Sequence, residues 1–458
     1  MRPFALSYLL ILLVSVLAIA TLVIVGAQHY PALAAALPAA HAAALSGTTP
    51  LARLLLQIVV ILVAARSLGL LFRRIAQPAV IGEIIAGLLL GPSLLGWLWP
   101  AASAQLFAPA SLAPLGLLSQ IGVLVFMFLV GLDLDLGAIR HKARDAIIVS
   151  HTSIFVPFVL GVGLVLIAYP QLVVPGVSFQ ALALFMGIAM SVTAFPVLAR
   201  ILEGRGLMHT VIGRSAIACA AIDDVTAWCL LALVVALVNA GSLGGVGLTI
   251  VLTATFVAVI LLVVKPLLAR WAARRQSRGA DALDISVVLV VLLLAATVTE
   301  VIGIHALFGA FLAGIAMPAS GAFRSAVRKR LHAFATIVLL PLFFALSGLR
   351  TQLGLIDGAD DWLLCGAIIA IAIPGKLGGS YFAARLTGAG REEAFTIGAL
   401  MNTRGLMELI VLNLGYDLGI LSPRVFTMMV IMALVTTLMT GPLLTLVQRR
   451  GHALARTA

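Results

Sequence analysis

Two adjacent aspartates, Asp223 and Asp224, lie halfway along a segment that is otherwise apolar enough to cross a membrane. A charged carboxylate near a bilayer centre costs at least about 2.5 kcal/mol, and ionisable groups at that depth usually line a path for an ion or a proton. Neighbouring residues on a helix point about 100° apart. We therefore expect one carboxylate to meet a transported ion and the other to meet a structural partner. The alternative is that both only hold the helices together.

Lys376 is the charge partner that the sequence predicts for these carboxylates. It lies near the middle of its own apolar span, residues 362–384, among glycines that permit close helix contact. A buried ammonium and a buried carboxylate offset each other, and removing one strands the other at a cost of about 3–5 kcal/mol. A lysine that snorkels to one face is the alternative, which the central depth of Lys376 disfavours.

Two other spans carry interruptions at their centres. In 179–201, Pro196 removes a helix hydrogen bond, and Ser191 and Thr193 precede it. Unwound backbone at membrane depth is tolerated only where it is buried in protein or lines a cavity, and matching breaks in two halves of a chain indicate a transport site. The second span, 393–416, has a run of mid-span residues of this kind: Asn402, Thr403, Arg404, Gly405 and Glu408.

Glu83 and Glu300 are weaker candidates for a transport role. Each lies within or close to an apolar span, where it could equally pair with a neighbour or sit at the lipid interface. The chain has no P-loop, H-x-x-x-H or G-x-S-x-G motif and no C-x-x-C pair. We therefore expect a protein that is not an enzyme and needs no cofactor.

The composition is that of a polytopic helical membrane protein. Of the 458 residues, 62% are hydrophobic and 10% are charged, against roughly 25% charged residues in a soluble domain. The net charge of +12 does not indicate nucleic-acid binding, because the basic residues alternate between loops and form no single patch. This alternation predicts a cytoplasmic C-terminus.

Hydropathy predicts an extra N-terminal helix and thirteen spans after residue 50. Residues 1–50 would form that helix and an outside linker, although 1–42 could instead be a cleaved signal. Residues 448–458 would be a short cytoplasmic tail without a regulatory domain. The expected spans are 5–27, 51–72, 78–96, 114–134, 145–168, 179–201, 211–238, 247–269, 283–301, 303–318, 334–349, 362–384, 393–416 and 424–447.

The span order suggests an inverted repeat. The first interrupted span is followed by the aspartate helix and the second by 424–447, and the two sets run through the membrane in opposite directions by the charge of their loops. Basic residues on both sides of 285–318 require an even number of crossings there, so we expect two short helices broken near Gly303 to His305.

Several stretches resemble the monovalent cation:proton antiporter-2 family, which includes bacterial sodium/proton antiporters, potassium efflux systems and plant cation/proton exchangers. The resemblance covers nearly the whole chain after residue 50. It rests on QPAVIGEIIAGLLLGPSLLG (77–96), IGVLVFMFLVGLDLDL (121–136), SVTAFPVLARIL (191–202), AAIDDVTAWCLLAL (220–233), ALFGAFLAGIAMP (306–318), LPLFFALSGLRT (340–351) and MNTRGLMELIVLNLG (401–415).

The resemblance implies an all-α, inverted-repeat antiporter fold with two broken, crossing helices, assembled as a homodimer in a bacterial cytoplasmic membrane. A mobile core would comprise 145–238 and 362–447, and a dimerisation scaffold would comprise 51–134 and 283–349.

The resemblance also implies roles for the site residues. Asp224 would bind the cation or the proton, Asp223 would pair with Lys376, and Thr193 would lie near the crossing. The expected activity is exchange of Na⁺ or K⁺ for H⁺, and a monovalent cation channel that uses the same acids is the alternative.

Overall fold

The computed structural model describes residues 49–75, 77–108, 111–133, 143–208, 210–239, 243–274, 281–318 and 321–457. Every regular element in these ranges is helical. Ten of the described helices are long and apolar enough to cross a membrane. The expected helix near 5–27 lies outside the described residues, and the total of thirteen core spans stays a prediction.

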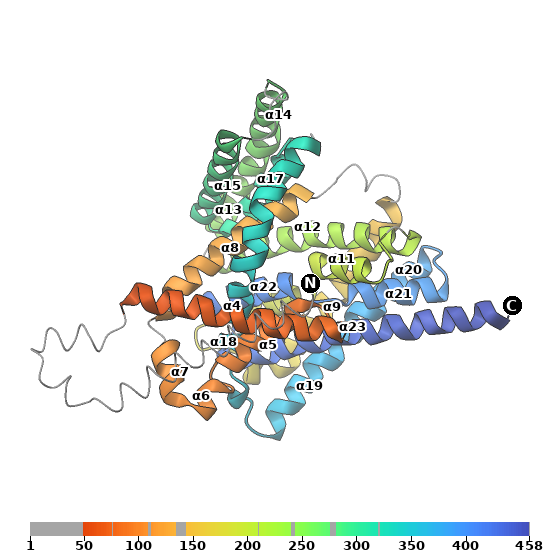
Figure 1. Cartoon of the computed structure of the whole chain (residues 1–458). Helices are drawn as coiled ribbons and strands as arrows, with labels where there is room; N and C mark the ends of the chain where they lie inside the picture. The colour runs from red at the N-terminus through yellow and green to blue at the C-terminus, as the bar shows by residue number, and fades with distance from the viewer. Residues whose placement is uncertain are drawn as a thin grey trace, which may run out of the picture.

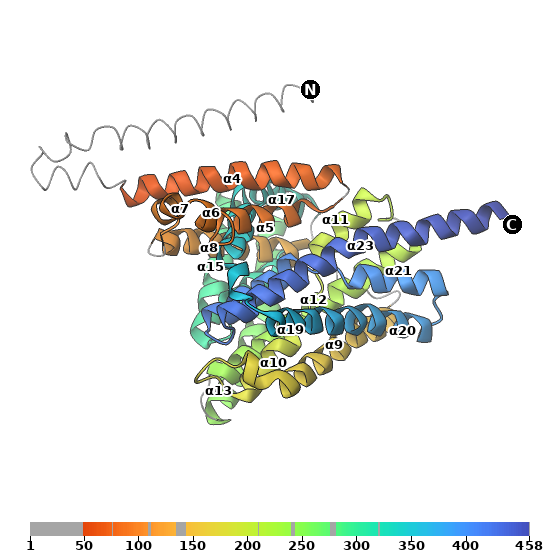
Figure 2. The ribbon, with the colours of Figure 1, turned by 90° about the horizontal axis from the view of Figure 1, so that it is seen from below.

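The axes of the long helices α4, α9, α19 and α23 are roughly aligned, as in a bundle that crosses a bilayer (Figure 2). Helices α13, α14, α15 and α17 gather at the top of Figure 1, apart from α11, α20 and α21 at the right. The helices are α4 (Pro50–Arg74), α5 (Ala79–Leu90), α6 (Leu95–Leu98), α7 (Pro100–Leu106), α8 (Leu112–Asp133), α9 (Ala143–Leu172), α10 (Phe179–Ala189), α11 (Phe195–Gly204), α12 (Val211–Asn239), α13 (Leu243–Val259), α14 (Lys265–Arg274), α15 (Ala282–Ile302), α16 (Ala306–Ala316), α17 (Gly321–Phe334), α18 (Leu340–Arg350), α19 (Ala359–Ile373), α20 (Gly379–Leu386), α21 (Arg391–Met401), α22 (Leu406–Asp417) and α23 (Pro423–Thr457), joined in places by the π-helical segments η3 (Ile260–Val264), η4 (Ala335–Leu339) and η6 (Pro374–Gly378) and the 3₁₀ turn η5 (Leu353–Leu355).

Both breaks expected within membrane spans are confirmed. Between α10 and α11 the chain leaves the helix after Ala189, and Pro196 stands in the first turn of α11, where its missing N–H would have no helical partner. Between α21 and α22 the chain is unwound up to Gly405. Gly405 has a φ of 139°, a backbone conformation that only glycine adopts readily.

The third break, at Gly303 to His305, is also present, and α15 agrees with the expected span 283–301 to within one residue at each end, whereas α16 is shorter than the expected 303–318. Helix α15 spans 21 residues, whereas α16 has 11, about 16 Å, and is too short to cross alone. The span expected at 334–349 begins earlier, because the basic helix α17 continues through η4 into α18. The loop expected at 97–113 contains α7.

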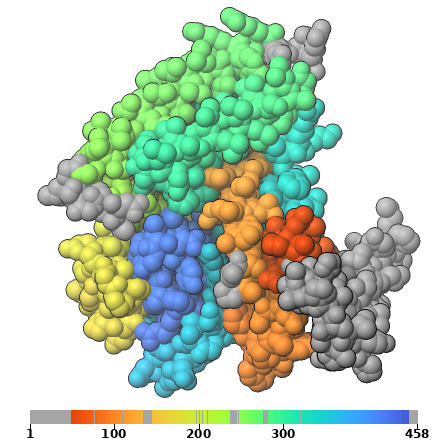
Figure 3. All heavy atoms as spheres, turned by 90° about the vertical axis from the view of Figure 1, so that its left-hand side faces the viewer, coloured from red at the N-terminus to blue at the C-terminus, as the bar shows by residue number. Residues whose placement is uncertain are grey.

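Segments that are far apart in the sequence form one end of the bundle. In Figure 3, which looks at the left-hand side of Figure 1, blue C-terminal segments lie between yellow and orange segments from the first half of the chain. Helices from the two halves of the chain therefore lie side by side at this end.

Glycines allow α8 and α16 to pack backbone to backbone. A Cβ atom added at Gly131 would lie 2.1 Å from the carbonyl oxygen of Phe311, and one added at Gly314 would lie 2.1 Å from that of Phe128. Small residues at such contacts let membrane helices approach closely, because association between helices in lipid depends on van der Waals packing.

We expect Gly131→Leu to push these two helices apart and lower the melting temperature of the detergent-purified protein. Overpacking costs about 1–3 kcal/mol where atoms can adjust, and a backbone oxygen adjusts little. Gly116→Leu on the same helix is the matched control, because nothing lies within 4 Å of a Cβ at Gly116. Equal melting temperatures for the two variants would contradict this account of the contact.

Candidate ion-binding site

The two breaks contact each other directly. The backbone N–H of Ala194 donates to the carbonyl of Thr403 at 2.9 Å, and the hydroxyl of Thr193 donates to the carbonyl of Met401 at 3.2 Å. Residues about 200 positions apart in the chain thus satisfy each other's unwound backbone, and the two interrupted spans cross at their breaks.

Asp223 is held on several sides beside this crossing. Its carboxylate is fully buried and accepts from the backbone N–H of Thr193 at 3.0 Å and from the hydroxyl of Ser153 at 3.3 Å. Lys376 forms an ion pair with it at 3.2 Å, also without solvent exposure. The Lys376 ammonium donates as well to the carbonyl of Ser191. Asp223 and Lys376 therefore tie α12 and η6 to the break that follows α10.

Lys376 belongs to the π-helical segment η6. Such single-turn widenings of a helix are rare in proteins overall, and those that occur often lie at functional sites. The helix there begins with Pro374, which lacks the N–H that a regular ladder would use. The wider turn sets the direction in which Lys376 leaves the helix.

A second buried ion pair joins Arg404 and Glu408 at 3.4 Å, and neither side chain is exposed. Arg404 also donates to the carbonyls of Ala189 at 3.2 Å and Met190 at 2.6 Å, at the C-terminal end of α10. A cation there is favourable because the last carbonyls of a helix carry partial negative charge.

Asp224 has a different environment from Asp223. It is 2% exposed, and neither of its carboxylate oxygens has a hydrogen-bond partner among the described residues. Asn402 in the second break is fully buried, and both its amide atoms also lack a partner in the described part of the chain. Unpartnered buried polar groups cost about 1–3 kcal/mol each, and more if charged, so these two side chains have free capacity to bind.

The remaining candidates have other positions. Ser191 lies in the first break, where its hydroxyl donates to the carbonyls of Ile154 and Gly187. Glu83 is buried on α5, which packs against α4 and α18 and also contacts α23. Glu300 accepts from the backbone N–H of Ala306 at 2.7 Å and caps the start of α16. The described contact of Glu300 thus lies at the break between α15 and α16.

Several hydroxyls at the crossing were missed by the sequence reasoning. Besides Ser153, Thr437 on α23 donates to the carbonyl of Arg404 at 2.8 Å, and the hydroxyl of Thr440 lies 3.5 Å from that of Thr403. The signal was available, since Thr437 and Thr440 are spaced three apart in an apolar span and so share one helix face.

Comparisons with known proteins agree with this architecture. The family model described as "Sodium/hydrogen exchanger, transmembrane" matches residues 58–449. The chain is 44% identical to the Na⁺/H⁺ antiporter NhaS4 of Synechocystis over 86% of this chain and 97% of that protein. It is 42% identical to cation/H⁺ antiporter 19 of Arabidopsis thaliana and 33% identical to K⁺/H⁺ antiporter 1 of Saccharomyces cerevisiae. These matches cover 86% and 88% of this chain, and 50% and 47% of those proteins. The chain therefore spans about half the length of the plant and yeast relatives.

Among solved structures, the sodium proton antiporter MjNhaP1 of Methanocaldococcus jannaschii superposes with a TM-score of 0.62 at 13% identity. The superposition covers 86% of this chain and 96% of the other, so the two share a fold. From the family model and the relatives that match most of its length, the chain belongs to the sodium/hydrogen exchanger family of integral membrane proteins.

Proposed function

We propose that this protein is a secondary antiporter that exchanges Na⁺ or K⁺ for H⁺ by alternating access, with Asp224 as the shared binding site. The observation that carries the proposal is the balance of buried charge. Asp223 pairs with Lys376 and Arg404 pairs with Glu408, which leaves the Asp224 carboxylate without a partner of opposite charge among the described residues. A proton or a cation would complete the balance.

Exchange follows from the physics of such a site. Burial penalises the charged carboxylate, so Asp224 favours either protonation or a bound cation over standing alone. One carboxylate cannot hold both at once. If the core moves across the membrane only when its buried charge is compensated, each direction of movement carries one of the two ions. A proton gradient then drives the cation the other way without ATP, which makes the protein a transporter and not an enzyme.

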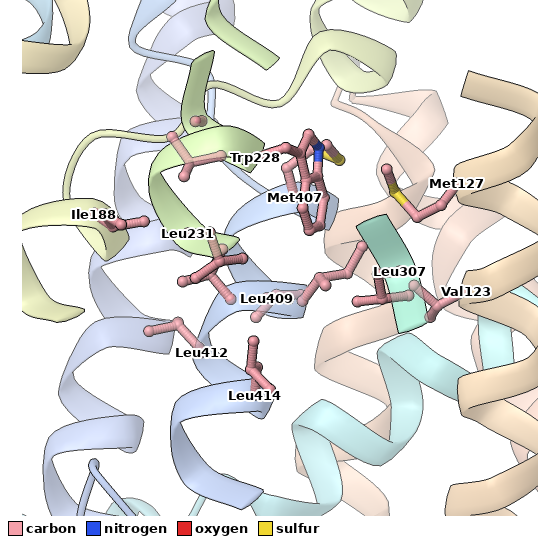
Figure 4. Packing of buried hydrophobic residues seen from close by; sticks show 14 of the residues in the cluster. Val123, Met127, Ile188, Trp228, Leu231, Leu307, Met407, Leu409, Leu412 and Leu414 are labelled. Atoms are coloured by element: carbon pink, nitrogen blue, oxygen red, sulfur yellow. The ribbon is translucent and has the colours of Figure 1, made fainter. Parts of the chain in front are cut away.

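The expected division into core and scaffold would place an interface between the part of the protein that moves and the part that stays fixed. In Figure 4, Trp228 on α12 and Met407 on α22 lie on the side of the proposed core, and Val123, Met127 and Leu307 on α8 and α16 lie opposite. Apolar contacts are non-directional and can shift, but Asn413 of the core donates to Ser347 of the scaffold at 2.7 Å, and a movement of the core would have to break this bond. We propose that 51–134 and 283–349 form the scaffold and the interface of a homodimer.

The names of the relatives support antiport but leave the cation open. Those reported above are a Na⁺/H⁺, a cation/H⁺ and a K⁺/H⁺ antiporter. The channel alternative has no support in these comparisons. Channels usually build a filter from rings of residues contributed by symmetric subunits, whereas crossed, broken helices around a buried site fit alternating access. We propose that the protein lies in a bacterial cytoplasmic membrane, and by the charge of its loops we place its C-terminus inside.

Proteoliposomes with an acid interior and an internal pH dye test the function. We expect NaCl, KCl or both to release protons from the vesicles, and choline chloride to have no effect. Protein-free liposomes control for leakage. Absence of any cation-dependent proton movement would overturn the proposal, and cation uptake that is independent of proton movement would favour the channel.

A further inference from the structure

Four half-helix ends meet at the crossing. At three of them lies a side chain whose charge is opposite to the partial charge of that helix end. Arg404 and Lys376 donate to the carbonyls at the negative C-terminal end of α10. The carboxylate of Asp223 accepts from the N–H of Thr193, next to the positive N-terminal end of α11. Glu408 stands in the first turn of α22. Each charge matches the sign that the helix dipole favours at that end.

The fourth end, the C-terminus of α21, has a different environment. Its carbonyls meet neutral groups, namely the hydroxyl of Thr193 at Met401 and the hydroxyl of Thr440 at Ala399. The residue that caps this helix is Asn402, whose side chain is fully buried and whose amide atoms have no partner among the described residues. The end of α21 therefore combines partial negative charge with a free amide oxygen, at membrane depth.

This end also lies next to the aspartate pair. Thr193 joins the two, because its N–H binds Asp223 while its hydroxyl binds Met401, the residue before Asn402. Helices α12 and α21 pack against each other. Asp224 and Asn402, whose side chains both lack a hydrogen-bond partner among the described residues, thus belong to neighbouring segments.

We propose that Asn402 is a ligand of the transported cation, its amide oxygen coordinating the ion together with the Asp224 carboxylate at the C-terminal end of α21. The inference rests on the proposed function and deepens it. Carboxylate and carbonyl oxygens suit hard cations, and carbonyl dipoles alone can replace the water shell of K⁺. A cation at this point would supply the positive charge that the end of α21 does not receive from the groups that contact it.

Asn402→Leu separates this role from a structural one. The substitution keeps the branched shape of the side chain with two methyl groups in place of the amide atoms, and replacing an unsatisfied buried polar group by an apolar one of the same shape is near neutral or stabilising. We expect the purified variant in choline chloride to melt at or above the temperature of the wild type. We expect the stabilisation that NaCl or KCl gives the wild type to shrink, and the apparent KM for the cation to rise roughly tenfold, since a bond to a charged group is lost.

Asn413→Leu is the matched control. Asn413 is also a buried asparagine, on α22, but its amide donates to Ser347 at 2.7 Å and Leu409 at 2.9 Å and accepts from Arg350 at 2.8 Å. Removing it should lower the melting temperature and leave the relative affinities for Na⁺, K⁺ and Li⁺ unchanged. Should Asn402→Leu fail to fold, Asn402→Ser, which shortens the side chain, decides the question by the same two readouts.

The outcomes distinguish failure of the Asn402 assignment from failure of the proposed antiport. If the wild type exchanges cations for protons and the folded Asn402 variants keep every apparent KM within twofold, Asn402 is no ligand and antiport stands. If the variants raise the KM values and lose the cation-dependent stabilisation, the assignment holds. If the wild type itself moves no protons in response to a cation, the proposed function and this inference both fail.

Discussion

Asp224→Asn is expected to abolish cation-driven proton movement in proteoliposomes while the protein remains folded. The amide has nearly the shape of the carboxylate but can neither take up and release the proton nor balance the charge of a cation. Because the Asp224 carboxylate makes no hydrogen bond within the described structure, its replacement by an amide breaks none there. The melting temperature in choline chloride should therefore not fall, and it should rise if burial of an uncompensated charge destabilises the wild type.

The matched control is Asp133→Asn. Asp133 pairs with Arg328 at 3.5 Å at the end of α8, and both side chains are substantially exposed, so losing the pair should change little. Exchange that persists at the wild-type rate in Asp224→Asn would contradict the role of Asp224.

Competition of two ions for one carboxylate also predicts how the apparent KM for the cation depends on pH. In the wild type, protons compete with the cation, so the apparent KM for the cation must rise as the pH falls on the side to which the site is open. A KM that does not change with pH would show that the two ions bind at separate sites.

Lys376→Met is expected to cause the largest loss of stability of any single substitution at the crossing. It leaves the Asp223 carboxylate buried without its ammonium partner and removes the donor to the Ser191 carbonyl. Stranding one member of a buried pair costs about 3–5 kcal/mol. The measurement is the melting temperature of the purified variant, with Lys265→Met, at the start of α14, as a lysine outside the crossing for comparison.

The double variant Asp223→Asn, Lys376→Met identifies the cause. Once the carboxylate is neutral, the missing ammonium no longer leaves a buried charge, so the double variant should recover much of the stability that Lys376→Met lost. The asparagine can still accept from the Thr193 N–H. If the double variant is no more stable than the single one, the main role of Lys376 is its bond to Ser191 and not its pair with Asp223.

The sequence by itself determined the membrane class, the depth of the charged residues and the places where the helices break. These follow from local properties: the length of an apolar run, the backbone restrictions of proline and glycine, and the high cost of a charge in lipid. The breaks before Pro196 and at Gly405 are confirmed for this reason. Helix length was harder to predict, as α16 and the continuous α17 to α18 helix show, because hydropathy does not mark where a helix leaves the bilayer.

Only the tertiary structure decided which side chain meets which. Spacing on α12 required Asp223 and Asp224 to face different directions, but the rotation of that helix against its neighbours decides which of them meets Lys376. In the same way, Arg404 and Asn402 are both polar residues in one break, yet the side chain of Arg404 binds the end of α10 and the side chain of Asn402 has no hydrogen-bond partner in the described chain. Contacts between segments about 200 residues apart depend on packing, which no local pattern encodes.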